Sequence, residues 1–214
     1  MTRESKALTL AGQRAAPIAA ALLVLLALAA APSVARAGQG PAQFLTALST
    51  RAVTELTEPG LDTGEKERRF RQLIGEGFDI PAIGRFVLGR YWRRADAATQ
   101  DAFLRVFEDM IVYRFLPLFE DYSGERVVVG SAVPFGENDQ FFAVSSVIAR
   151  SEGEPIAVDW RVHRAGDGFK IVDIVAEGVS IAVTLRSEYG SALKNNGGDV
   201  AKLVEELRAK LAQI

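Results

Sequence analysis

The sequence contains no cysteine and only one histidine, His163, in 214 residues. Without cysteine it cannot form disulfides, thiolate zinc sites, iron–sulfur ligation or a thiol nucleophile, and one histidine excludes a multi-histidine metal centre. We therefore expect no metal and no cofactor. The 25 Lys and Arg residues nearly balance the 27 Asp and Glu residues, so there is no excess of positive charge of the kind that nucleic-acid-binding proteins carry. We expect no nucleic-acid partner.

The first 37 residues have the features of an export signal. Arg3, Lys6 and Arg14 precede an apolar run over residues 18–31, and Ala35-Arg36-Ala37 supplies a cleavage site with small residues. The run is shorter than the roughly 20 residues that a membrane-spanning helix needs, so a retained anchor is the weaker alternative. We predict a cleaved signal peptide over residues 1–37 and a single exported domain over residues 38–214.

The chain after Ala37 is acidic and rich in aromatic residues. It carries 21 basic and 26 acidic side chains, a net charge of −5, and it holds all 12 Phe, 4 Tyr and 2 Trp of the sequence. A chain of this size buries roughly 70% of the surface that its unfolded form exposes. The composition therefore predicts a large apolar core.

Helical periodicity dominates the first half of this chain. Apolar residues recur at spacings of three and four over residues 41–57, after Asp62, from Asp79 to Gly89, and from about Asp96 to about Glu120. Pro117 lies inside the last of these helices. Because proline removes a backbone hydrogen bond and clashes with the preceding turn, we expect a kink or an early end near Phe115.

After Ser123-Gly124 the hydrophobic period changes to two. Strands are predicted over residues 127–133, 140–150, 156–164 and 169–176, and helices return at about residues 180–193 and after Asp199. Helices followed by strands and then helices indicate an α+β fold. We predict a curved antiparallel or mixed four-stranded sheet packed against a helical layer. Periodicity alone leaves open whether a filled core or an apolar cavity lies between them.

Ser180 and His163 do not form a convincing serine-hydrolase site. Ser180 lies in Glu177-Gly178-Val179-Ser180, which lacks the second glycine of a nucleophile elbow. We expect His163 to be exposed on the polar face of its strand, beside a hairpin turn. Ser180 is better interpreted as the cap of the helix that follows it.

Asp173 is the remaining candidate for catalysis. If residues 164 and 169 pair across their hairpin, Asp173 falls opposite Trp160, among apolar neighbours. A carboxylate in such a place is suited to act as a general base, as in cone-shaped α+β isomerases. The favoured alternative is a buried structural acceptor, satisfied by the Trp160 indole or by backbone N–H groups. The residues alone leave both roles of Asp173 open.

Several separated segments resemble the MlaC (toluene-tolerance) family of periplasmic phospholipid-binding proteins. The first, residues 78–93, reads FDIPAIGRFVLGRYWR, and the second, residues 173–186, reads DIVAEGVSIAVTLR. Residues 100–107 and Tyr113 resemble the long helix of the family, and residues 158–162 resemble its central strand. The resemblance extends over nearly all of residues 40–212.

This resemblance implies that residues 38–214 form a single lipid-binding domain that acts as a soluble, monomeric, periplasmic carrier. It supplies no catalytic residue, so we expect that the protein is not an enzyme. Members of the family hold phospholipid acyl chains in an apolar pocket between sheet and helices. They shuttle lipid between an outer-membrane lipoprotein complex and an inner-membrane ABC transporter complex, with transient contact to each, and are associated with outer-membrane lipid asymmetry and toluene tolerance. Under this interpretation we expect ten side chains around the lipid, chosen because they are large and apolar and recur at helix or strand spacing. They are Phe86, Val87, Tyr91, Phe103, Phe107, Ile111, Val144, Val158, Trp160 and Ile171.

One departure from the family pattern concerns the ligand. Many members have Asn-Tyr before the arginine of the second segment, where this chain has Thr184-Leu185 before Arg186. A branch of the family is associated with hopanoids, so a rigid polycyclic lipid is an alternative ligand to a phospholipid. A ligand-free adaptor that docks on a membrane complex is a third hypothesis.

Overall fold

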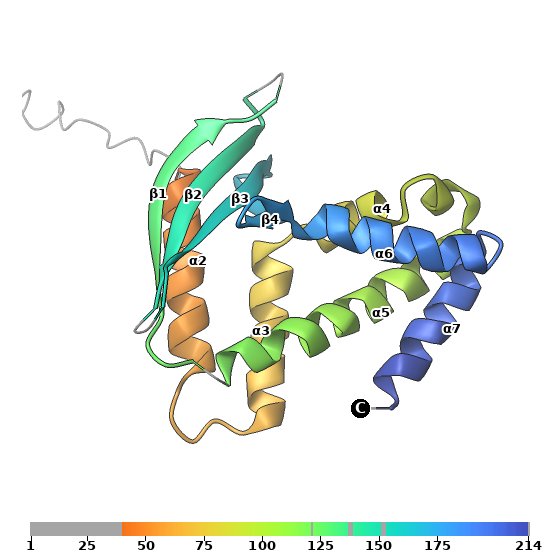
Figure 1. Ribbon diagram of the computed structural model, residues 1–214, viewed down its shortest axis with the longest axis horizontal. Helices are drawn as coiled ribbons and strands as arrows, with labels where there is room; N and C mark the ends of the chain where they lie inside the picture. The colour runs from red at the N-terminus through yellow and green to blue at the C-terminus, as the bar shows by residue number, and fades with distance from the viewer. Residues whose placement is uncertain (1–39, 121, 137–138, 151–152, 214) are drawn as a thin grey trace, which may run out of the picture. The chain divides into compact units, whose positions relative to one another are not determined.

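Helices and strands are segregated along the chain, as the α+β prediction requires (Figure 1). The structure, a computed structural model, describes residues 40–120, 122–136, 139–150 and 153–213, which all belong to the unit Gly38–Ile214. The predicted signal peptide over residues 1–37 lies outside the described residues. No helix in the described part of the chain has both the length and the apolar character needed to cross a bilayer.

All α-helices in the described residues except α2 (Pro41–Leu56) begin at a side chain that caps the first turn. Asp62, Asp79, Asp96, Ser180 and Asp199 each accept a hydrogen bond from a backbone N–H of the helix that follows, which satisfies a donor that the helix itself cannot pair. The N-cap role predicted for Ser180 is therefore confirmed. The helices are α2 (Pro41–Leu56), α3 (Thr63–Gly77), α4 (Ile80–Leu88), α5 (Ala97–Phe115), α6 (Ile181–Asn195) and α7 (Val200–Leu211).

Two of these helices end close to a proline or a glycine. α5 ends at Phe115, and Pro117 lies in a 3-10 turn, η2 (Leu116–Phe119), which confirms the predicted early end. α4 ends at Gly89, whose φ of +54° is accessible to glycine at little cost. A second 3-10 segment, η1 (Gly89–Arg94), then leads towards α5. The predicted helix ended at Gly89 and the next began near Asp96, so periodicity predicted no element where η1 lies.

The strands form one meandering antiparallel sheet in the order β1-β2-β3-β4-β5. The predicted number of four strands was wrong, because a fifth strand of two residues follows a tight turn at Glu177-Gly178, where both residues have positive φ. Two residues are too few for periodicity to reveal a strand. The strands are β1 (Arg126–Pro134), β2 (Phe141–Ala149), β3 (Ile156–Ala165), β4 (Gly168–Ala176) and β5 (Val179–Ser180).

Two irregularities interrupt the register of the sheet. In β1 the pairing with β2 shifts between Val129 and Ala132, and in β4 the pairing with β3 shifts so that Val172 is an extra residue between Ile171 and Asp173. An extra residue reverses which side chains face each side of the sheet beyond that point. The second shift determines the position of Asp173.

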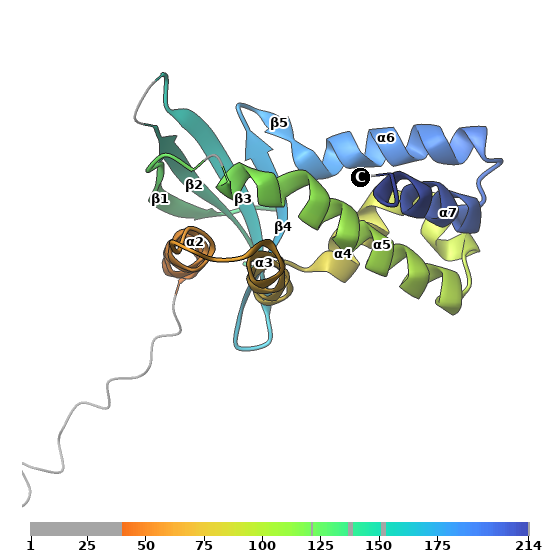
Figure 2. The same ribbon diagram turned by 90° about the horizontal axis from the view of Figure 1, so that it is seen from below.

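Apolar side chains form two core clusters. One lies among α3 to α7 and includes Phe103 and Phe107, and the other lies between the sheet and α2 and includes Leu45 and Val144. α2 lies along the sheet, and α7 packs against both α5 and α6 (Figure 2). The helical cluster is thus a second layer of the domain, distinct from the cluster beneath the sheet.

Candidate functional site

A small apolar cavity lies among α5, α6 and α7. It has a volume of about 140 Å³. Phe107, Ile111 and Leu185 lie in its wall, and Tyr113, Arg114, Glu188 and Lys210 are exposed at its margin. Arg114 Nη1 lies 3.4 Å from Glu188 Oε2 and so links α5 to α6 at this margin. The remaining wall is formed by Met110, Phe115, Tyr189 and Leu207.

Tyr189 is the buried polar group of the cavity. Its ring packs edge-on against Phe103 and Phe107, with centroid distances of 6.1 and 6.0 Å. Burial, and then the nearby Glu188 carboxylate, raise the pKa of the Tyr189 phenol to about 12. Its hydroxyl has no hydrogen-bond partner among the described residues. The phenol therefore stays protonated at neutral pH and can donate one hydrogen bond to a ligand.

The structure places the ten predicted lipid-contact residues in two groups. Val87, Tyr91, Phe103, Phe107 and Ile111 belong to the helical cluster, and Val144, Trp160 and Ile171 belong to the cluster beneath the sheet. Of the ten, only Phe107 and Ile111 line the cavity. The assignment of all ten to one lipid pocket stays a prediction.

Phe86 and Val158 lie outside both clusters. The Phe86 side chain is 42% exposed and lies beneath the Arg186 guanidinium, with 4.8 Å between Cζ and the ring centroid. Val158 is buried and is paired with Ser146 of β2 and Ala176 of β4. Helical spacing could not show that Phe86 faces a surface arginine, because Arg186 is a hundred residues away in the sequence.

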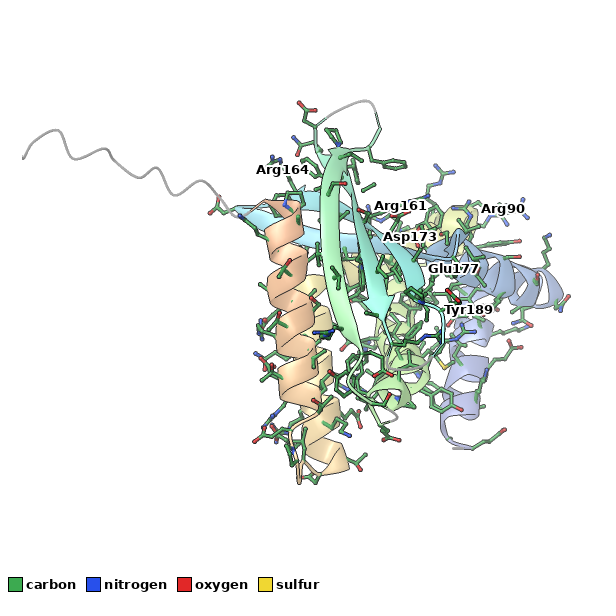
Figure 3. All side chains as sticks on the ribbon, turned by 60° about the vertical axis from the view of Figure 1, so that its left-hand side comes forward. Arg90, Arg161, Arg164, Asp173, Glu177 and Tyr189 are labelled. Atoms are coloured by element: carbon green, nitrogen blue, oxygen red, sulfur yellow. The ribbon has the colours of Figure 1, made fainter. Side chains whose placement is uncertain are left out.

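Asp173 is paired differently from the sequence prediction. Residues 164 and 169 do pair, but the extra residue Val172 places Asp173 opposite Arg161 instead of Trp160. The Trp160 indole donates instead to Ser146 Oγ at 2.8 Å. Asp173 accepts hydrogen bonds from Ser180 Oγ at 2.7 Å and from the Ala182 amide at 3.0 Å, and Arg161 Nη1 lies 3.3 Å from its Oδ2. Arg161, Asp173 and Glu177 are labelled in Figure 3.

These contacts agree with the predicted structural role of Asp173 as an acceptor for backbone N–H groups. Both of its oxygens are engaged at the start of α6, whereas a general base needs an oxygen directed at a substrate. Sequence reasoning overlooked Ser146, a buried serine that donates to the Val158 carbonyl and accepts from Trp160. No sequence pattern marked Ser146 as a partner of Trp160, because the two side chains meet only across β2 and β3.

His163 is not an exposed surface residue, contrary to the prediction. Its side chain is 20% exposed, its ring stacks on Phe141, and its Nε2 lies 2.9 Å from Asp79 Oδ2. Asp79 comes close because its amide donates to the Ile171 carbonyl on β4. The described residues contain no group of three or more His, Asp or Glu side chains that could hold a metal ion.

Comparison with known proteins decides the family. The family model described as MlaC protein matches residues 46–209. The chain belongs to the MlaC family. It is 20% identical over 197 residues, 90% of each chain, to the toluene tolerance protein ttg2D of Pseudomonas putida. It is 23% identical over 137 residues to a Haemophilus influenzae protein named intermembrane phospholipid transport system binding protein MlaC, and this match spans 63% of that relative.

The fold is also similar to that of a solved structure. That structure is described as the phospholipid-binding protein from Ralstonia solanacearum in complex with a phospholipid. The TM-score is 0.70 at 21% sequence identity, and the match covers 82% of this chain and 97% of the other. At this identity the similarity establishes a shared fold.

The two segments that carry the MlaC resemblance meet in the folded chain. Residues 78–93 form α4 and η1, and residues 173–186 form the end of β4, the β5 turn and the start of α6. Arg186 Nη1 donates to the Phe86 carbonyl at 2.9 Å. A Cβ at Gly89 would lie 2.9 Å from Arg186 Nη2, so the glycine allows the guanidinium to approach. The family pattern thus marks the junction between α4 and α6.

Proposed function

We propose that this MlaC-family protein is a non-enzymatic periplasmic carrier that binds phospholipid by its acyl chains and shuttles it between membrane complexes. The names of its relatives support phospholipid transport. The observation in this chain that carries the proposal is the apolar cavity among α5, α6 and α7, because its wall is aromatic and aliphatic and its charged residues are confined to the margin.

The cavity must enlarge to hold a lipid. Its volume of about 140 Å³ lies below the roughly 300–1,000 Å³ of ordinary ligand pockets. α5 packs mainly on α7, and α4 packs mainly on α6, so side chains such as Phe107, Tyr189 and Leu185 fill the space between α5 and α6. We propose that acyl chains enter by displacing these side chains as α5 and α7 move away from α6.

The energetic reason for such enclosure is the cost of exposing hydrocarbon to water. At about 0.8 kcal/mol per buried CH₂, two chains of roughly 16 carbons correspond to about 25 kcal/mol. A carrier that encloses both chains removes most of this barrier to crossing an aqueous compartment. The Tyr189 hydroxyl supplies one hydrogen-bond donor for a polar group of the lipid, such as an ester carbonyl.

The proposed partners are an inner-membrane ABC transporter complex and an outer-membrane lipoprotein complex, each contacted transiently by a monomeric carrier. The family membership and the intermembrane transport named for the Haemophilus relative support this proposal. Export by the predicted signal peptide would place the carrier between the two membranes. We take the ligand to be a phospholipid, with the polycyclic alternative decided by the experiment below.

The test is to purify the protein from a bacterial host and record native mass spectra, followed by organic extraction and lipid analysis. We expect a species heavier than the chain by one lipid, and an extract that contains phospholipid. A hopanoid in the extract would support the alternative ligand. A protein that is empty after gentle purification, and stays empty after incubation with phospholipid vesicles, would refute the carrier function.

A further inference from the structure

A second hollow lies on the opposite side of α6 from the apolar cavity. We call it the α4–α6 groove, and its volume is about 490 Å³. α4 and η1 form one wall and α6 the other; at 3.6 residues per turn, the α6 residues of the groove and those of the cavity fall on opposite helix faces. The lining residues are Val87, Leu88, Gly89, Arg90, Tyr91, Val183, Arg186, Ser187, Gly190, Ser191 and Lys194.

The groove is positively charged on an otherwise acidic domain. Arg90, Arg186 and Lys194 line it, and no acidic residue does. Within the described part of the chain, none of these three cations forms an ion pair with a carboxylate, whereas Arg71 pairs with Asp109 at 2.8 Å. Residues 38–214 together carry a net charge of −5. The groove is therefore a positively charged region on a domain whose net charge is negative.

Both guanidinium groups are held in place by aromatic rings. Arg186 lies over Phe86 and donates to its carbonyl, and Arg90 lies 4.9 Å from the Tyr91 ring centroid and donates to the Tyr91 hydroxyl at 2.9 Å. Figure 3 shows Arg90 on the helical part of the molecule. Neither contact neutralises the positive charge. Arginines fixed in this way lose little further conformational entropy when they bind an anion.

The length of the groove favours an extended ligand with several negative charges. Its α6 wall runs from Val183 to Lys194, about 16 Å at 1.5 Å per residue. Arg186 and Lys194 are eight residues apart, about 12 Å along the helix axis. A single phosphate or carboxylate is too small to span this distance, whereas an extended ligand can contact both cations without drawing them together. A concave wall also fits a protruding helix better than a flat bilayer surface.

We propose that the α4–α6 groove docks an acidic helical segment of a protein partner. Carboxylates seven or eight residues apart on such a helix match the spacing of Arg186 and Lys194, and Val183, which is 52% exposed, offers apolar contact at one end of the groove. This docking proposal rests on the proposed carrier function, because a carrier has to contact the complexes that supply and receive its lipid. Because the groove and the cavity lie on opposite faces of α6, docking and lipid binding can be tested separately.

The test is an NMR titration of the isotope-labelled protein with a synthetic acidic helix of about 15 residues, carrying Glu at helical spacing. We expect shifts of the Gly89, Gly190 and Ser191 amides that are stronger at low salt. The double variant R90E/K194E should weaken binding about tenfold or more through like-charge repulsion. The matched control K202E changes an exposed lysine of α7 and should alter the affinity by less than about twofold.

Three results would overturn the docking proposal. These are an equal loss in K202E, an absence of shifts at the groove, or complete competition by millimolar inorganic phosphate, which would indicate a small-anion site. Groove-dependent binding to phosphatidylglycerol vesicles without peptide binding would likewise replace it with a membrane contact. Protein stripped of lipid should bind the peptide as well as loaded protein does, so an empty cavity would refute the carrier function and leave the docking result intact.

Discussion

Asp173 fixes the first turn of α6 to the sheet through Ser180. Asp173 Oδ2 accepts the Ser180 hydroxyl hydrogen at 2.7 Å, and Ser180 Oγ in turn accepts from the Val183 amide at 3.1 Å. The second carboxylate oxygen accepts from the Ala182 amide at 3.0 Å. A buried carboxylate at a helix N-terminus also interacts favourably with the helix dipole. One side chain thus orders the junction between β4 and α6.

The substitution Asp173→Asn should destabilise the domain. The charge at the helix N-terminus is lost, and the side-chain amide nitrogen of the variant can place a donor where the structure needs an acceptor. We expect a loss of about 1–3 kcal/mol in the free energy of unfolding, measured by urea denaturation. Lipid binding by the folded fraction should persist.

The matched control is D159N, an exposed carboxylate on β3, which should change stability by less than about 0.5 kcal/mol. If D173N were as stable as the native chain, the anchoring role would be wrong. If D173N were stable but no longer transferred lipid, the hypothesis that Asp173 is a general base would regain support.

Filling the cavity should prevent lipid binding while the fold is retained. Ile111 lines the cavity and is only partly buried, so the larger indole of I111W can enter the space of about 140 Å³. We expect a stability change within about 1–3 kcal/mol and at least a severalfold drop in co-purified lipid, measured by native mass spectrometry. V128W, on a β1 residue that is 58% exposed, is the control and should bind lipid normally. Equal lipid content in I111W and V128W would exclude this cavity as the acyl-chain site.

The buried phenol of Tyr189 should make stability depend on pH in the alkaline range. Its pKa is raised from 10 to about 12, so the folded state keeps the proton to higher pH than the unfolded state does. The contribution is complete below pH 10 and is lost as the pH rises through 12. Over that range Tyr189 should account for a loss on the order of 2 kcal/mol.

The comparison of Y189F with the native chain isolates this effect, because phenylalanine does not titrate. Denaturant unfolding between pH 9 and 12 should show a steeper decline for the native protein. Parallel declines would show that the Tyr189 hydroxyl is accessible to hydroxide in the folded state. A titration of tyrosinate absorbance should show one group fewer titrating at the high end in Y189F.

Gly89 should not tolerate a side chain. Its φ is +54°, and a Cβ there would lie 2.9 Å from Arg186 Nη2, so G89A adds backbone strain and displaces the guanidinium from Phe86. We expect a loss of about 1–3 kcal/mol by thermal or chemical denaturation. The control G75A lies in α3 with open space at its Cβ and should raise stability by about 0.5–1 kcal/mol. A neutral G89A would contradict the close approach of Arg186.

Local chemistry allowed much of the fold to be predicted from the sequence. The cap at Ser180 and the end of α5 before Pro117 depend on neighbouring residues, and the structure bears them out. β5 and the extra residue in β4 depend on how the end of the sheet packs against α4 and α6, which local sequence patterns do not report. Nothing in the period of residues 169–176 marks Val172 as unpaired, so Asp173 was assigned to the wrong neighbour.

The candidate site was less predictable because it depends on contacts between distant segments. The helical periodicity of apolar residues and the size of their side chains could identify Phe107 and Ile111 as buried, and both line the cavity. They could not show that Val144 and Ile171 lie in a separate cluster beneath the sheet. His163 was misplaced for the same reason, since Asp79 reaches it only because its backbone pairs with Ile171.

The irregular pairing of β1 has a consequence for aggregation. β1 is the long outer strand of the sheet, and such strands can recruit a strand from another molecule. Here the register shift at Gly130-Ser131 interrupts the regular pairing of β1 with β2, and Pro134 removes a donor at the end of the strand. On the other side, β5 has only two residues, and Phe78 bridges to Ile171. These features make the exposed valines of the sheet less available to a strand from another molecule.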